Sequence, residues 1–144
     1  MKKITAVILA LIIFMCTTCM AAPETLPSDC SCNATWLLTV TNPASSVISS
    51  YDKQHNISGY SVNGAEVSVY ILSNGRYTLM KRNGAIVSCK VGASGMFVQP
   101  IALSQGKSEI LVRAELNGNV QYVRRAINVL SLNFFNLLKG FNIF

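Results

Sequence analysis

Histidine, tryptophan and acidic residues are scarce in this chain of 144 residues, which contains one histidine, one tryptophan and six aspartates or glutamates. The acidic residues are scattered and form no Asp-x-Asp loop for calcium. One histidine beside a few cysteines gives no recognisable zinc spacing. The sequence therefore predicts no metal site and no cofactor.

Motifs for catalysis and for nucleic-acid binding are lacking as well. His55 lies in a polar stretch where Asp52 is the only nearby carboxylate, and the GASG segment at 92–95 lacks the spacing of a nucleophile elbow. Charged residues make up 12% of the chain, and the basic pairs at 81–82 and 124–125 would point to opposite faces of a strand. We expect no catalytic residues, no enzymatic activity and no nucleic-acid partner.

The first residues are typical of a secretory signal peptide. A basic start at Lys2 and Lys3 precedes an apolar run at 4–15, and small residues follow near Ala21. Cleavage after Ala21 would remove residues 1–21 and leave ten basic and six acidic residues, a net charge of +4. A retained membrane anchor and lipidation at a signal cysteine are the alternatives. The sequence predicts a secreted protein, extracellular or at the cell surface.

Three cysteines remain after such cleavage: Cys30, Cys32 and Cys89. An odd number in an oxidising compartment leaves one thiol free or bonded to another molecule. A bond between Cys30 and Cys32 would close a strained ring, so Cys89 is the better intrachain partner for either. In the alternative, Cys89 stays reduced and serves as a small core residue.

Residues 22–35 contain prolines and polar residues without any period, which predicts a flexible arm that carries Cys30 and Cys32. Thiols on such an arm are well placed to reach a neighbouring molecule. The alternative is an arm strapped to its own domain.

Residues 36–129 show the period-two alternation of β-strands with one buried face. Val67, for example, alternates with Glu66 and Ser68. Asn-Gly steps at 63–64, 74–75, 83–84 and 117–118 favour tight turns. This pattern predicts an all-β fold, an antiparallel β-sandwich of about seven strands. The predicted strands cover residues 36–41, 57–62, 65–72, 76–81, 85–91, 96–103, 108–116 and 119–129.

Four stretches carry a family resemblance: TNP at 41–43, ISGYSVNGAEVSV at 57–69, VGASGMF at 91–97 and IALSQGKSEI at 101–110. They are similar to the patterns "sGtaepGatVtV", "vdsdGsFs" and "LseGeNtI" of bacterial immunoglobulin-like (Big-type) domains, which occur in secreted and cell-surface proteins. The match spans residues 39–129, with Ser108 where the family usually has Asn. The resemblance implies a seven-stranded immunoglobulin-like sandwich, with Phe97 and Ile110 in its core. It also implies a structural, spacer, adhesive or carbohydrate-associated role.

The C-terminal residues 130–144 form an apolar segment with helical spacing, predicted to be a short amphipathic helix. Apolar residues on more than one side favour a docked segment over one free in water. It would pack on its own sandwich, insert into a neighbouring subunit or lie on a membrane surface. The candidate partner-binding residues are Leu130, Phe134, Leu137, Leu138 and Phe141.

Together these features predict a secreted, non-enzymatic structural or interaction protein of the cell surface. It would associate with itself or with another surface protein through its arm and its C-terminal segment. One alternative is an accessory module that binds carbohydrate or cell wall, which would need tyrosines clustered on one face. Its candidate tyrosines are Tyr51, Tyr60, Tyr70, Tyr77 and Tyr122. The other alternative is a protein that associates with membranes through residues 130–144.

Overall fold

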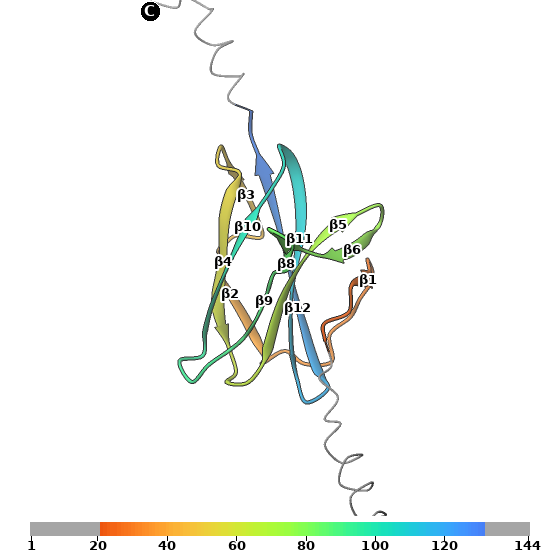
Figure 1. Cartoon of the computed structure of the whole chain (residues 1–144), viewed down its shortest axis with the longest axis vertical. Coiled ribbons are helices and arrows are strands. Elements are labelled where there is room, and N and C mark those ends of the chain that lie inside the picture. Colours follow the sequence, from red (N-terminus) through yellow and green to blue (C-terminus); the bar gives the residue numbers. More distant parts are fainter. Residues whose placement is uncertain (1–20, 132–144) are drawn as a thin grey trace, which may run out of the picture.

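The computed structural model describes residues 21–131 and confirms the predicted all-β class: these residues form strands and no helix. Figure 1 shows two layers of strands facing each other in an immunoglobulin-like β-sandwich. The strands are β1 (Thr25–Pro27), β2 (Leu38–Asn42), β3 (Val47–Ser50), β4 (Gln54–Ser61), β5 (Glu66–Ser73), β6 (Arg76–Leu79), β7 (Lys81–Arg82), β8 (Ala85–Ile86), β9 (Ser88–Lys90), β10 (Met96–Ala102), β11 (Gly106–Leu116) and β12 (Asn119–Val129).

The strands divide into a large and a small sheet. The large sheet has the order β1-β6-β5-β11-β12-β3, with β9 also beside β5, and the small sheet has the order β10-β4-β2. The strands β7 and β8 form a separate pair. Two predicted strands are therefore wrong in extent, because residues 76–81 and 85–91 each divide between the large sheet and this pair.

The predicted turns at Asn-Gly steps are confirmed where the step joins two paired strands. Both residues have positive φ at 74–75, 83–84 and 117–118, as a two-residue hairpin turn requires. The step at 63–64 differs, since only Gly64 has positive φ there. It connects β4 of the small sheet to β5 of the large one, so the chain crosses between layers instead of turning back.

The main core lies between the two sheets and follows the predicted alternation. Val67 and Val69 of β5 are fully buried in it, together with Phe97 and Ile110, whose predicted core positions are confirmed. Tyr70, the residue after Val69, belongs to a second cluster. Because successive side chains of a strand point to opposite faces, this second cluster lies on the outer face of the large sheet.

Strand β3 was not predicted and is the exception to the antiparallel pattern. It pairs in parallel with β12, from Val47 opposite Ala126 to Ser50 opposite Val129. The chain leaves β2 in the small sheet, passes the cis peptide bond between Asn42 and Pro43, and continues along the edge of the large sheet. The short strand has no sequence signal because its partner lies at the other end of the chain.

The arm differs from the predicted flexible segment, because the structure shows it strapped to its own domain. Strand β1 pairs with β6, and Leu26 is buried in the second cluster beside Tyr70, Tyr77 and Leu111. The tyrosine hydroxyl of Tyr70 donates a hydrogen bond to the carbonyl of Pro23 at 2.9 Å. The apolar strip on the outer face of the large sheet needs this cover, and Leu26, between the exposed Thr25 and Pro27, supplies it.

Some predicted features fall outside the described residues. Residues 1–20 of the predicted signal peptide lie outside them, as do the candidate partner-binding residues Phe134, Leu137, Leu138 and Phe141. Leu130 is described, and its N–H donates to the carbonyl of Ser50 at 2.8 Å. Over residues 21–131 there is no helix of the length and hydropathy needed to cross a membrane.

Candidate functional site

The arm brings Cys30 and Cys32 to β12, with Cys30 against the second cluster on the outer face of the large sheet and Cys32 at the open edge of the strand. Cys32 is exposed, and its sulfur is held by the backbone of Tyr122. The Tyr122 N–H donates to Sγ at 3.2 Å, and the thiol lies 3.6 Å from the Tyr122 carbonyl oxygen. An exposed thiol is therefore fixed against a rigid strand.

Cys30 is half-buried and lies beside a cation. The guanidinium Nη2 of Arg124 donates to the carbonyls of Ser28 at 3.2 Å and Cys30 at 3.0 Å, and lies 3.7 Å from the Cys30 sulfur. Burial raises the pKa of the Cys30 thiol, and the positive charge of Arg124 partly offsets that effect. The two thiols therefore differ in environment: one is open to solvent and the other partly withdrawn.

Arg124 is itself positioned by aromatic and acidic neighbours on the same face. Its guanidinium lies over the ring of Tyr77, 5.9 Å from the centroid. The Tyr77 hydroxyl donates to the carboxylate of Glu109. This row of β6, β11 and β12 side chains holds the cation that binds the arm.

Asn33 fixes the end of the arm to the hairpin between β11 and β12. Its side-chain oxygen accepts from the N–H of Val120 at 2.5 Å, and its amide nitrogen donates to the carbonyl of Gly118 at 3.1 Å. The sequence reasoning missed the roles of Asn33, Tyr122 and Arg124, because nothing in their local sequence indicates a partner so far along the chain.

Cys89 lies on the other side of the large sheet. It stands opposite Val67 in the register between β9 and β5, and it packs against the main core. Cys30 packs against the second cluster on the outer face. The intrachain bridge from Cys89 to Cys30 or Cys32 is therefore not formed, since the sheet separates Cys89 from Cys30 and Cys32 is held at the edge of β12, and all three thiols are free.

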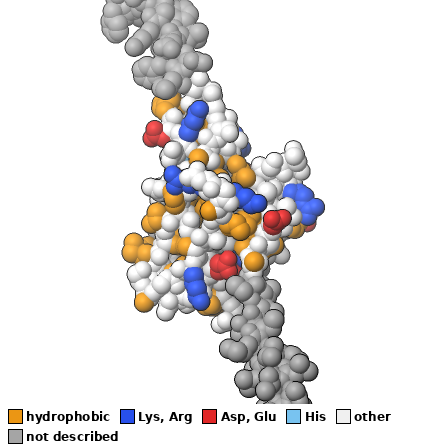
Figure 2. Space-filling model, in the orientation of Figure 1, with side chains coloured by type: hydrophobic (Ala, Val, Ile, Leu, Met, Phe, Trp, Pro, Cys, Tyr) orange, Lys and Arg blue, Asp and Glu red, His pale blue; other side chains and the backbone are white. Residues whose placement is uncertain are grey.

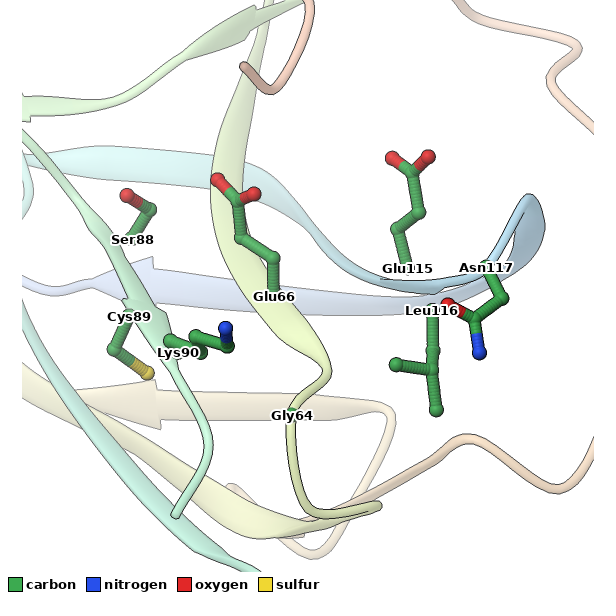
Figure 3. A pocket seen from close by; sticks show the side chains of 8 residues that line it. All are labelled: Gly64, Glu66, Ser88, Cys89, Lys90, Glu115, Leu116 and Asn117. Carbon is green, nitrogen blue, oxygen red and sulfur yellow. The ribbon is translucent and has the colours of Figure 1, made fainter. Parts of the chain in front are cut away.

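A hollow of about 510 Å³ opens at the end of the large sheet, near the start of β5 and the end of β11 (Figure 3). The carboxylates of Glu66 and Glu115 point to one side of the sheet, whereas Cys89 and Leu116 point to the other. Glu66 stands directly opposite Glu115 in one register and opposite Lys90 in the other. The wall of the hollow thus combines two acidic groups and one ammonium with the apolar side chains of Cys89 and Leu116.

Arg113 reduces the repulsion between these carboxylates. It is 6% exposed and forms an ion pair with Glu115. Burial alone would lower the pKa of Arg113, but the hydrogen bond to Glu115 and its charge raise the pKa overall. Its Nε and Nη1 atoms and the hydroxyl of Ser68, its neighbour across the strands, are buried without hydrogen-bond partners.

The residues considered for catalysis and metal binding do not converge. The ring nitrogen Nε2 of His55 is hydrogen-bonded to the backbone oxygen of Asp52 at 2.8 Å and not to its carboxylate. Among residues 21–131, no three histidine, cysteine or acidic side chains are grouped as metal ligands.

The outer face of the small sheet has a different character. Tyr60, Met96 and Val98 are 52%, 55% and 56% exposed, and Met96 stands directly opposite Tyr60. None of the outward positions of this sheet carries a charge. They are Thr39, Thr41, Gln54, Asn56, Ser58, Tyr60, Met96, Val98, Pro100 and Ala102. Figure 2 shows hydrophobic side chains gathered along the side where β4 and β10 lie.

Comparisons with known proteins found no match: no family model, no curated protein and no solved structure matches the chain.

Proposed function

We propose that this chain is a secreted, non-enzymatic structural or interaction protein of the cell surface that associates with copies of itself. In this proposal residues 1–21 are removed on export and the sandwich acts outside the cytosol. The observation that carries it is the exposed thiol of Cys32, which is held at the open edge of β12 by the backbone of Tyr122, while Cys89 packs against the main core.

The covalent link would form between the arms of two copies. The thiolate of Cys32 in one chain attacks a disulfide oxidant, either a small-molecule or a protein disulfide, and releases one thiol. The Cys32 thiolate of a second chain then displaces the remaining half of the oxidant. The two cysteines lose two electrons and two protons, and the oxidant is reduced to two thiols.

The test is migration of the mature chain on a non-reducing gel after oxidation with glutathione disulfide. We expect a covalent dimer band that collapses on addition of reductant. It should disappear in a Cys30→Ser, Cys32→Ser double variant and persist in Cys89→Ser, the control that removes the thiol packed against the main core. A single monomer band under the same conditions would overturn the proposal.

The alternative of a carbohydrate-binding module gains less support from the positions of the tyrosines. Tyr70 and Tyr77 are buried under the arm, beside the partly buried Tyr122. Tyr60 lies near the end of β4, whereas Tyr51 precedes the start of that strand. The five tyrosines therefore form no exposed aromatic platform on one face.

A further inference from the structure

We propose that the uncharged outer face of the small sheet is the docking surface for residues 132–144 of a second copy. This inference rests on the proposed self-association and names the surface that receives the partner. The face is centred on Met96 and Val98 of β10 and Tyr60 of β4.

The composition of this face is that of an interface centre. Interface centres are depleted in charged residues and enriched in tyrosine and methionine. The mature chain carries sixteen charged residues, ten basic and six acidic, yet none occupies an outward position of β2, β4 or β10. By contrast, the outer face of the large sheet carries Glu109, Arg113 and Arg124.

Both edges of the small sheet carry features that hinder an added strand, so we take its face as the docking surface. At the β2 edge, Gln121 binds the backbone of Leu37 and Leu38, and Arg125 donates to the carbonyl of Val40 at 3.2 Å. At the β10 edge, Pro100 has no N–H to offer. The backbone carbonyl of Asn56, the residue opposite Pro100, accepts a hydrogen bond from the side-chain amide of Asn42 in β2 at 2.8 Å, so it points away from β10. In this pair the backbone of Pro100 therefore points away from β4, and the nitrogen that lacks an N–H faces the open edge.

The C-terminal segment suits this face in chemistry. Residues 130–144 carry one charged side chain, Lys139, among nine leucine, isoleucine and phenylalanine side chains. Such a segment needs an apolar surface to leave water, and Met96, Val98, Pro100 and Ala102 of β10 offer one beside Tyr60 of β4. Arg82 reaches this face at Gln54, the opposite end of β4 from Tyr60, so the centre of the face holds no charge.

The point where the segment leaves the sandwich favours a second copy over the same chain. It leaves after Leu130, which is bound to Ser50 at the end where β4 begins. Met96 and Tyr60 lie at the opposite end of β10 and β4, about 20 Å away at about 3.3 Å per residue. The short helix that the sequence predicts, two to three turns, spans about 11 to 16 Å. Such a helix, which must first turn over the end of the sandwich, would end before it covers its own Met96.

The test measures the molar mass of the mature chain by light scattering during size exclusion, in reducing buffer so that no disulfide contributes. We expect a non-covalent oligomer. Val98→Lys places a charge at the centre of the face and should weaken association about tenfold or more. The matched control is Val47→Lys, because Val47 is an equally exposed valine on β3 of the large sheet, 61% exposed. It should change association less than about twofold.

Complementation distinguishes a contact between two copies from one within a chain. A chain that ends at residue 131 keeps the face and lacks the segment, and the Val98→Lys chain keeps the segment and lacks the face. Each should be monomeric alone, and an equimolar mixture should form a one-to-one complex.

The remaining outcomes separate this inference from the proposed function. If the wild-type chain is monomeric in reductant but still cross-links on oxidation, the docking surface is wrong and the proposed function stands. The docking surface is also wrong if truncation at residue 131 abolishes association while Val98→Lys does not. It is likewise wrong if residues 132–144 bind phospholipid vesicles and do not bind a second copy. If the chain neither associates nor cross-links, the proposed function is wrong as well.

Discussion

Gly59 of β4 lies so close to Thr39 of β2 that a Cβ atom built on it would be 2.0 Å from the Thr39 carbonyl oxygen. The contact is with backbone, so no side-chain rotation can relieve it. It lies beside the irregular register of β2 and β4 between Val40 and Asn42. Glycine at this position lets the two strands approach within the small sheet.

Gly59→Ala should therefore lower the free energy of unfolding by about 3 kcal/mol or more, because one strand must shift. Gly92→Ala is the matched control, since a Cβ there meets nothing within 4 Å and its φ is not positive. It should change the free energy of unfolding by less than about 1 kcal/mol. Urea unfolding followed by tryptophan fluorescence measures both. Equal effects of the two substitutions would contradict the close approach.

Leu26→Ala tests whether the arm is strapped to the domain. Leu26 is 8% exposed in the second cluster, so the substitution should lower the free energy of unfolding by about 2 to 3 kcal/mol. It should also speed hydrogen exchange at the amide of Leu79, which donates to the carbonyl of Glu24 at 2.8 Å. Thr25→Ala, at an exposed position of the same strand, is the control. An arm free of the domain would leave the exchange of Leu79 unchanged.

Local patterns in the sequence were enough to predict the sandwich, and distant contacts account for what was missed. The alternation around Val67 and the turn at 117–118 depend on residues that are neighbours in the chain, so both can be recognised from the sequence alone. The placement of the arm depends on Leu26 meeting Tyr70 and on Arg124 meeting Cys30. The two residues of each pair are far apart in the chain, so no local periodicity indicates their contact. For the same reason the sequence gives the number of thiols but does not place Cys30 and Cys89 on opposite faces of a sheet.

Tyr70 should make the fold sensitive to alkali. Burial raises the pKa of Tyr70 to about 12, whereas an unfolded tyrosine titrates near pH 10. Below pH 10 the phenol is neutral in both states. Between about pH 10 and 12 the unfolded state loses its proton first, so the free energy of unfolding falls by about 2 to 3 kcal/mol.

Urea unfolding at pH 8, 10 and 11.5 measures this loss. Tyr70→Phe should be less stable at pH 8 by about 1 kcal/mol, because the hydrogen bond to Pro23 is lost, and should show a shallower decline above pH 10. Tyr60→Phe, at an exposed position, should leave the decline as in the wild type. If the free energy of unfolding of Tyr70→Phe falls above pH 10 as steeply as that of the wild type, the alkaline sensitivity arises from a group other than Tyr70.

The two arm thiols should react in a fixed order. Cys32 is exposed, while burial withdraws Cys30 and raises its pKa, which lowers its thiolate fraction at pH 8. Iodoacetamide at pH 8 should therefore modify Cys32 before Cys30, and the rate at Cys30 should still be rising above pH 9. Mass spectrometry of the digested chain after timed quenching measures each site. In a brief oxidation the same order makes Cys32 the first residue to cross-link, so Cys32→Ser should lose most of the early covalent dimer and Cys30→Ser should retain it. Faster alkylation of Cys30 than of Cys32 at pH 8 would show that the arm opens before either thiol reacts.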